Sequence, residues 1–175
     1  MQKETTLAEE AREILATETD PIERNKATIR LMVAEFMCKG NMEIVKELCA
    51  PDYKFWPVVY TAPEDREGHA RDNHATLHTI FPDLKATIDQ QIGEGEWVAT
   101  HHTLTGTHLA EMPTPMGTFA PTGKKVSWRS MSFHRFRDGK IVEGWLSYNP
   151  TSILQQIGQL KPWPGDPAFR KQEQQ

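Results

Sequence analysis

The chain has 175 residues, a net charge of −4 at pH 7 and two cysteines. This length suits one domain with tails, large enough to bury a core without disulfide or metal staples. The acidic balance and the absence of a basic stripe argue against nucleic acid and anionic membranes as partners. Cys38 and Cys49 lack zinc or redox spacing, and no apolar segment has the length of a signal peptide or membrane span. We therefore expect a cytoplasmic protein with reduced thiols.

The amino-terminal part of the chain is predicted to be helical. Residues 1–20 carry a weak apolar stripe at helical spacing, which predicts a helical extension outside the main domain. Residues 22–38 repeat apolar side chains at the same spacing, and Gly40 follows as a natural end for a helix. This second segment is therefore expected to be a helix with one buried face.

Two shorter helices are predicted next. Asn41 is a plausible N-cap for a short helix that stops before Pro51. A third helix is expected over residues 68–80, where the sequence FPD ends it.

The rest of the chain predicts antiparallel strands. From residue 84 apolar and polar side chains alternate, the sequence GEGE turns the chain, and residues 97–107 are rich in β-branched types. Asp138 and Gly139 form a predicted tight turn between two further strands. Helices followed by a meander of strands indicate an α+β fold, in which helices cover one face of a curved sheet.

The segment LAEMPTPMGTFAPTG between the predicted strands carries three prolines among apolar residues, including Met116. Proline is excluded from a central strand, so we expect a long loop here. The loop either forms a lid over a ligand pocket or packs on the edge of its own sheet.

Six short segments carry a family resemblance: PDYKF, IFPDL, LTGTH, PTGKKV, FRDGKIVEGW and ILQQIG. Their order and spacing resemble those of SnoaL-like polyketide cyclases, also called ester cyclases, within the nuclear transport factor 2-like superfamily. The match covers roughly residues 22 to 158, so the domain is placed at 21–158 and a tail at 159–175. The resemblance implies a conical half-barrel with helices on its concave face, a deep apolar pocket, commonly a homodimer through the sheet, and no cofactor.

Three positions depart from what the resemblance implies. In the cyclases an aspartate on the last strand acts as general acid/base, and that position here is Leu146. The histidine common in the family two residues earlier is Gly144, and the aspartate frequent three residues later is Asn149. The polar pair that assists the catalytic aspartate falls on Ser130 and Ser132. A leucine cannot move a proton, and hydroxyls without an adjacent base are poor nucleophiles. The family's mechanism is therefore in question for this chain.

Histidine is the remaining side chain suited to proton transfer near neutral pH. His101 and His102 are adjacent, so they point to opposite faces of their strand. The family often has arginine and then a bulky aromatic at these positions, which favours His101 as the inward residue and catalytic base. The alternative is a hydrogen-bonded structural histidine. His134 shares the face of Ser130 and Ser132, yet lies close to the turn and is expected at the rim.

Other side chains are expected to contact a ligand. Tryptophan side chains can stack on a ring of the ligand, and methionine side chains can make apolar contacts with it. His69 and Asn73 reach a ligand if the face of the helix that carries them turns toward the pocket. His74 and His78 have a metal-compatible spacing but lack a third ligand, so no metal is predicted. The predicted substrate-binding residues are Trp56, Tyr60, Asn73, His102, Met116, Trp128, Ser130, Ser132 and Leu146.

Two functions of different class follow. The first is a cofactor-free acid/base enzyme, a cyclase, isomerase or dehydratase, that acts on a small hydrophobic, cyclic or polyketide-like molecule with His101 as base. The second is a non-catalytic binding protein for such a molecule, which has lost the aspartate at position 146. A pocket histidine bonded to a carboxylate favours the first, and a dry pocket without paired titratable groups favours the second.

Overall fold

The computed structural model describes residues 6–57, 61–70, 75–114 and 116–161. Its helices are α1 (Leu7–Thr17), α2 (Pro21–Met32), the π-helix η1 (Val33–Cys38), α3 (Glu43–Leu48), α4 (Arg66–Gly68), α5 (Ala75–Ile80) and α6 (Pro150–Gln156). Its strands are β1 (Cys49–Trp56), β2 (Lys85–Glu94), β3 (Trp97–Thr107), β4 (Met112–Thr114), β5 (Gly117–Phe119), β6 (Lys125–Arg137) and β7 (Lys140–Tyr148).

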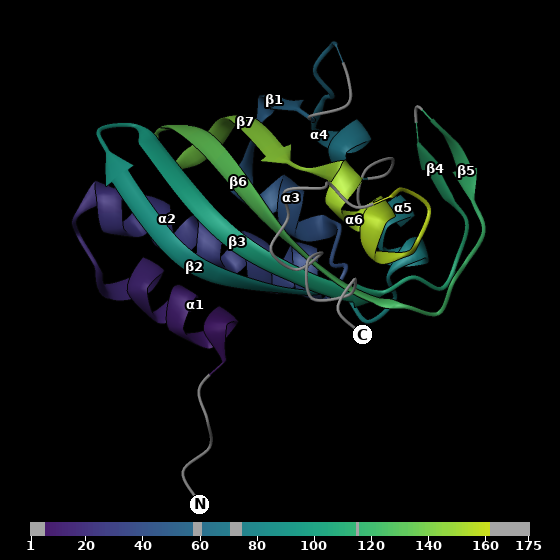
Figure 1. Cartoon of the computed structure of the whole chain (residues 1–175). Helices are drawn as coiled ribbons and strands as arrows, with labels where there is room; N and C mark the ends of the chain where they lie inside the picture. Colours follow the sequence, from purple (N-terminus) through teal and green to yellow (C-terminus); the bar gives the residue numbers. More distant parts are fainter. Residues whose placement is uncertain (1–5, 58–60, 71–74, 115, 162–175) are drawn as a thin grey trace, which may run out of the picture.

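A curved sheet of five strands, in the order β1-β7-β6-β3-β2, forms the body of the molecule. The neighbouring strands from β7 to β2 pair antiparallel, and β1 joins β7 in parallel. Figure 1 shows α2 and α3 along one side of this curved sheet, with α1 beside α2 at the amino-terminal end. The predicted α+β class, a half-barrel with helices on its concave face, is confirmed.

Local sequence signals account for the first helices. Asp20 caps α2, since its carboxylate accepts a hydrogen bond from the Ile22 amide at 2.9 Å. The helix continues without a break into η1, and Gly40 follows with a φ of 70°. The predicted helix over residues 22–38 is thus confirmed, with its last turns widened to a π-helix. The predicted cap of α3 is wrong, because the Asn41 amide donates to Glu35 instead.

The predicted hairpin turn is confirmed between β6 and β7. Asp138 and Gly139 both have positive φ, 52° and 73°, as a type I′ turn requires. The proline-rich segment forms a small separate hairpin, β4 and β5, in which Met112 is buried and Met116 is 56% exposed. Short strands of this kind tolerate Pro113 because no further strand pairs with them.

Two hydrophobic clusters fill the concave side. The first lies beneath α2, η1 and α3 and includes Ile29, Leu31, Val33, Phe36, Ile44, Val45, Tyr53, Phe55, Val98, Phe136 and Ile141. The second joins the far end of the sheet to α5 and α6 and includes Ile80, Phe81, Leu84, Leu104, Met112, Val126, Trp128, Ile153, Leu154 and Ile157. No helix in the described ranges is long and apolar enough to cross a membrane.

Candidate functional site

Strand β3 presents His102, and not His101, to the concave side. His102 is buried on the same face as Val98 and Leu104, whereas the side chain of His101 is 35% exposed. His101 instead lies on the outer face, with its Nδ1 atom 3.3 Å from a carboxylate oxygen of Asp89. The prediction that His101 faces inward is therefore wrong. Strand alternation from the buried Val98 and Leu104 assigns the inward face to His102, and that signal was present in the sequence.

Five buried polar side chains lie on the concave face of β3 and β6. One of them, Thr100, accepts a hydrogen bond from Gln91 of β2, and we call the other four the polar row. They are His102, Ser130, Ser132 and His134. His102 is paired across the strands with Ser130, and its Nε2 atom lies 2.9 Å from the Ser132 hydroxyl oxygen. Three successive inward positions of β6 are therefore polar, where a purely structural core would carry apolar residues.

Three atoms of the polar row have no hydrogen-bond partner within the described part of the chain. These are Nδ1 of His102, the Ser130 hydroxyl oxygen and Nδ1 of His134. A buried polar atom left without a partner costs about 1–3 kcal/mol. Unsatisfied groups gathered on one face are therefore a mark of a site that receives hydrogen bonds from a bound molecule.

Both histidines of the polar row are neutral at physiological pH. Burial lowers the pKa of His102 to about 4, with a further contribution from the neighbouring His101. Burial also lowers the pKa of His134 to about 3, and His102 adds to that effect. A neutral imidazole carries one N–H donor and one lone pair, so each ring is able to donate one hydrogen bond and accept another at neutral pH.

Strand β7 lines the polar row on its other side. Gly144 and Leu146 lie directly opposite His134 and Ser132, and Tyr148 lies opposite Ser130. Leu146 is only half-buried and packs against the first core cluster. The aliphatic side chain thus adjoins the hydroxyl of Ser132, and no proton can be exchanged at this position of β7.

The remaining predicted ligand residues are dispersed. Trp128 faces inward but packs in the second core cluster, with its ring centroid 5.2 Å from that of Phe81. Trp56 pairs with Trp145 on the outer face, and Met116 is exposed at the tip of the small hairpin, so neither joins the polar row. Tyr60 and Asn73 lie outside the described residues.

Strand β1 and helix α4 bring two further polar residues to the concave side. The hydroxyl of Tyr53 lies 3.2 Å from Nδ1 of His69, and both residues are buried. The His69 ring stacks on Phe55, with centroids 3.7 Å apart and an interplanar angle of 6°. Tyr53 was missed from sequence because β1 reaches the site through nonlocal pairing. His69 was noted, but the sequence did not decide which face of its helix turns inward.

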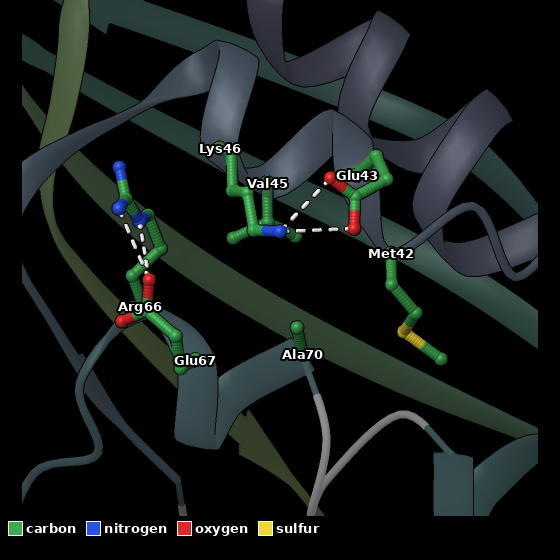
Figure 2. Close-up of a pocket in the computed structure, with 7 residues that line it drawn as sticks. All are labelled: Met42, Glu43, Val45, Lys46, Arg66, Glu67 and Ala70. Carbon is green, nitrogen blue, oxygen red and sulfur yellow. Dashed lines mark hydrogen bonds and ion pairs between the residues drawn. The ribbon is translucent and has the colours of Figure 1, made fainter.

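A cavity of about 410 Å³ lies between α3 and α4 (Figure 2). It is lined by Met42, Glu43, Val45, Lys46, Arg66, Glu67 and Ala70. Each cation on its rim pairs with an acid of its own helix, at 2.9 Å for Lys46 with Glu43 and 3.0 Å for Arg66 with Glu67. Ala70 points toward α3 in Figure 2 and directly follows His69 in the chain. The cavity therefore borders the chain segment that carries His69, and it is lined by none of the four residues of the polar row.

Comparison with known proteins identifies the family. Residues 27–157 match the family model of the SnoaL-like polyketide cyclases. The chain therefore belongs to the SnoaL-like polyketide cyclase family. No curated protein matches the sequence significantly.

Solved structures share the fold over most of the chain. IdmH, a putative polyketide cyclase from Streptomyces antibioticus, is 31% identical, with a TM-score of 0.68 over 77% of this chain and 99% of that one. AclR, a putative hydroxylase from Streptomyces galilaeus, is 28% identical, with a TM-score of 0.68 over 79% and 98% of the two chains. A putative SnoaL-like polyketide cyclase from Jannaschia sp. CCS1 has a TM-score of 0.71 at 20% identity, over 83% and 98% of the two chains. The nuclear transport factor 2-like architecture is thereby established.

Proposed function

We propose that this protein is a cofactor-free acid/base enzyme of the cyclase type, with His102 as its proton-transfer group. The substrate is a small hydrophobic ring or polyketide-like molecule that carries a carbonyl group. One observation carries the proposal: His102 is buried, bonded to Ser132 at 2.9 Å through Nε2, and has its Nδ1 atom unsatisfied. This arrangement holds the imidazole in one orientation and leaves one nitrogen for a bound molecule.

The proposed ring closure requires proton transfers by a side chain and no cofactor. Neutral His102 removes a proton from a carbon next to the carbonyl, and the C–H electron pair moves into an enolate. The enolate carbon then forms a bond to a second carbonyl carbon of the same molecule, whose oxygen takes the proton back from the imidazolium. Ser132 holds the ring through Nε2. The hydroxyl of Ser130, which has no partner within the described residues, orients an oxygen of the substrate in this proposal.

A binding protein is the second candidate, and one observation favours it. The hydrogen bond that His102 makes within the described ranges is to a serine and not to a carboxylate. A carboxylate partner would raise the basicity of the ring, as in catalytic dyads. The same polar row would in that case hold the ligand's oxygen atoms without chemistry.

A pair of adjacent variants tests the proposal. The measured reaction is deuterium exchange at the carbon next to the carbonyl of 1-tetralone and 2-tetralone in D₂O, followed by NMR. His102→Ala should lower catalysed exchange by about 10²-fold, the range for loss of a positioned base. His101→Ala, on the opposite face of the same strand, should leave it unchanged. Tetralone binding without exchange in the wild-type protein would favour the binding protein instead.

We further propose that two chains associate through the outer face of the sheet. Five residues form a continuous row across all five strands on that face, because each is paired with the next. They are Ile92, Ala99, Phe133, Trp145 and Trp56. Phe133 is 50% exposed and Ile92 is 61% exposed, which is unusual for large apolar side chains unless they meet a partner. A cytoplasmic location is also proposed, and the free thiols of Cys38 and Cys49 are consistent with it.

A further inference from the structure

The hydroxyl of Tyr53 occupies a notch that Gly144 leaves in strand β7. A Cβ atom at position 144 would lie 2.7 Å from that hydroxyl oxygen and 3.2 Å from both His134 Cδ2 and Phe55 Cδ2. The φ of Gly144 is not in the left-handed region, so the position needs glycine for space and not for conformation. The hydroxyl of Tyr53 and the ring of His134 therefore border the same small space at one end of the polar row.

His69 fixes the position of this hydroxyl. Its Nδ1 atom lies 3.2 Å from the Tyr53 oxygen, and its ring is stacked on Phe55 and set edge-on to Phe36 at 5.1 Å. Such stacking holds the imidazole at one place and in one plane. When Nδ1 carries the proton, it donates to the Tyr53 oxygen and the phenol hydrogen is available to another acceptor.

The phenol remains a donor at all physiological pH values. Burial raises the pKa of Tyr53 well above its ordinary value, and electrostatic interactions with Cys49 and Glu64 act in the same direction. A protonated phenol in a desolvated setting is a strong hydrogen-bond donor toward a carbonyl or hydroxyl oxygen.

We propose that Tyr53 is a second anchor for the ligand, with His69 as its positioning residue. This inference rests on the proposed function and specifies its substrate class. His102 is level with Ser130 on β6 and Tyr148 on β7, whereas the notch lies at Gly144, four residues further along β7. Two strand spacings and four residue rises separate His102 from the notch by about 16 Å. The ligand is therefore an extended ring system with oxygen groups at both ends, one at the His102 end and one at Tyr53.

Two probes that differ by one terminal hydroxyl test this. At pH 6, where their hydroxyls are neutral, 2-hydroxyanthraquinone and 2,6-dihydroxyanthraquinone are titrated into the protein and the two Kd values compared. The wild-type protein should bind the dihydroxy probe about 3- to 10-fold more tightly, as expected for one added hydrogen bond. Tyr53→Phe should abolish that ratio, and the exposed outer-face control Ser147→Ala should retain it.

Further variants separate a ligand role from a structural one. Replacement of Tyr53 by 3-fluorotyrosine, a stronger acid of similar size, should increase the ratio, whereas a purely structural hydroxyl would leave it unchanged. His69→Leu should reduce the ratio, and His69→Gln, which keeps a hydrogen-bonding group, should restore part of it. If Tyr53→Phe does not fold, the fluorotyrosine protein decides the question.

The possible failures are distinct. An equal ratio in folded Tyr53→Phe and wild-type protein overturns the role of Tyr53 and leaves the proposed chemistry of His102 standing. If the wild-type protein binds neither probe, the proposed ligand site is itself wrong and this inference falls with it. Loss of tetralone exchange in His102→Ala with an intact Tyr53-dependent ratio would support both.

Discussion

His102 and Ser132 are joined across strands β3 and β6 by a hydrogen bond of 2.9 Å, on the concave face of the sheet. The two side chains are buried, and the imidazole is contributed by β3. On β7 the residue opposite Ser132 is Leu146, whose side chain is aliphatic. The proposed proton-transfer group therefore comes from β3, because Leu146 leaves β7 without a titratable side chain opposite Ser132.

The two neutral histidines of the polar row predict acid sensitivity. Their pKa values in the folded protein, about 4 for His102 and about 3 for His134, lie below the ordinary value of 6.5. The unfolded chain therefore binds more protons, so stability is complete above pH 6.5 and falls as the pH drops toward 4. For His102 the difference between the two pKa values corresponds to about 3 kcal/mol.

Urea denaturation at pH 7.5, 6.5, 5.5 and 4.5 measures this dependence. His102→Gln and His134→Gln should each flatten the decline in the free energy of unfolding between pH 6.5 and 4.5, because the titrating group is gone. A decline as steep as in the wild-type protein in both variants would mean that other groups cause the acid sensitivity.

Replacing Leu146 with aspartate tests whether position 146 lines the site. Leu146 is half-buried opposite Ser132, so Leu146→Asp places a carboxyl group beside a hydroxyl with water within reach. Desolvation should raise its pKa above the ~4 of a free aspartate and suit it to acid/base work. The variant should fold cooperatively, with a loss of about 1–3 kcal/mol in urea denaturation.

The matched change Ile141→Asp gives the contrast. Ile141 lies on the same strand but is fully buried in the first core cluster, so its carboxylate would be unpaired and the loss should be several kcal/mol. If Leu146→Asp is as damaging as Ile141→Asp, position 146 belongs to the core and not to the site.

Sequence alone predicted the features that depend on local signals. The tight turn at Asp138 and Gly139 follows from the residues that tolerate positive φ. The orientation of His101 and His102 was predicted wrongly because a comparison with the family outweighed the alternation of Val98 and Leu104. Burial of those two apolar residues fixes the face of the whole strand.

The rest of the site could not be predicted from the sequence, because it depends on pairing between strands that are distant in the chain. Trp56 was expected in the pocket, but the parallel register of β1 against β7 pairs it with Trp145 on the outer face. The place of Tyr53 depends on the missing side chain of Gly144, a residue some 90 positions later in the chain. No periodicity within one segment reports such a relationship, because it depends on which strands become neighbours.

The outer apolar row predicts the oligomeric state. Sedimentation at micromolar concentration should give about 40 kDa, twice the 20.0 kDa of one chain. Phe133→Glu places a charge in the middle of the row, where desolvation opposes association, and should produce a monomer. Ser127→Glu adds the same charge to an exposed outward position of β6 away from the row and should remain dimeric. A monomeric wild-type protein would contradict the prediction.

The close fit at Gly144 predicts an energetic coupling between this glycine and Tyr53. Gly144→Ala introduces a methyl group 2.7 Å from the Tyr53 hydroxyl oxygen, so the packed rings must shift, at a cost of about 1–3 kcal/mol. Tyr53→Phe removes that oxygen and loses its hydrogen bond to His69. In the double variant the methyl group enters the vacated space. The loss of unfolding free energy in the double variant should therefore be smaller than the sum of the two single losses, by about 1 kcal/mol.

Urea denaturation of the four proteins in this double-mutant cycle measures the coupling. Gly144→Ala combined with Ser147→Ala is the control, since the outer-face serine is exposed and its loss should be additive. Strict additivity in the Tyr53 cycle would mean that His134 and Phe55, at 3.2 Å, set the cost of the methyl group by themselves. A coupling energy in the Tyr53 cycle that is absent from the Ser147 cycle would instead support the position of the Tyr53 hydroxyl in the notch left by Gly144. From that position it is proposed to bind the ligand.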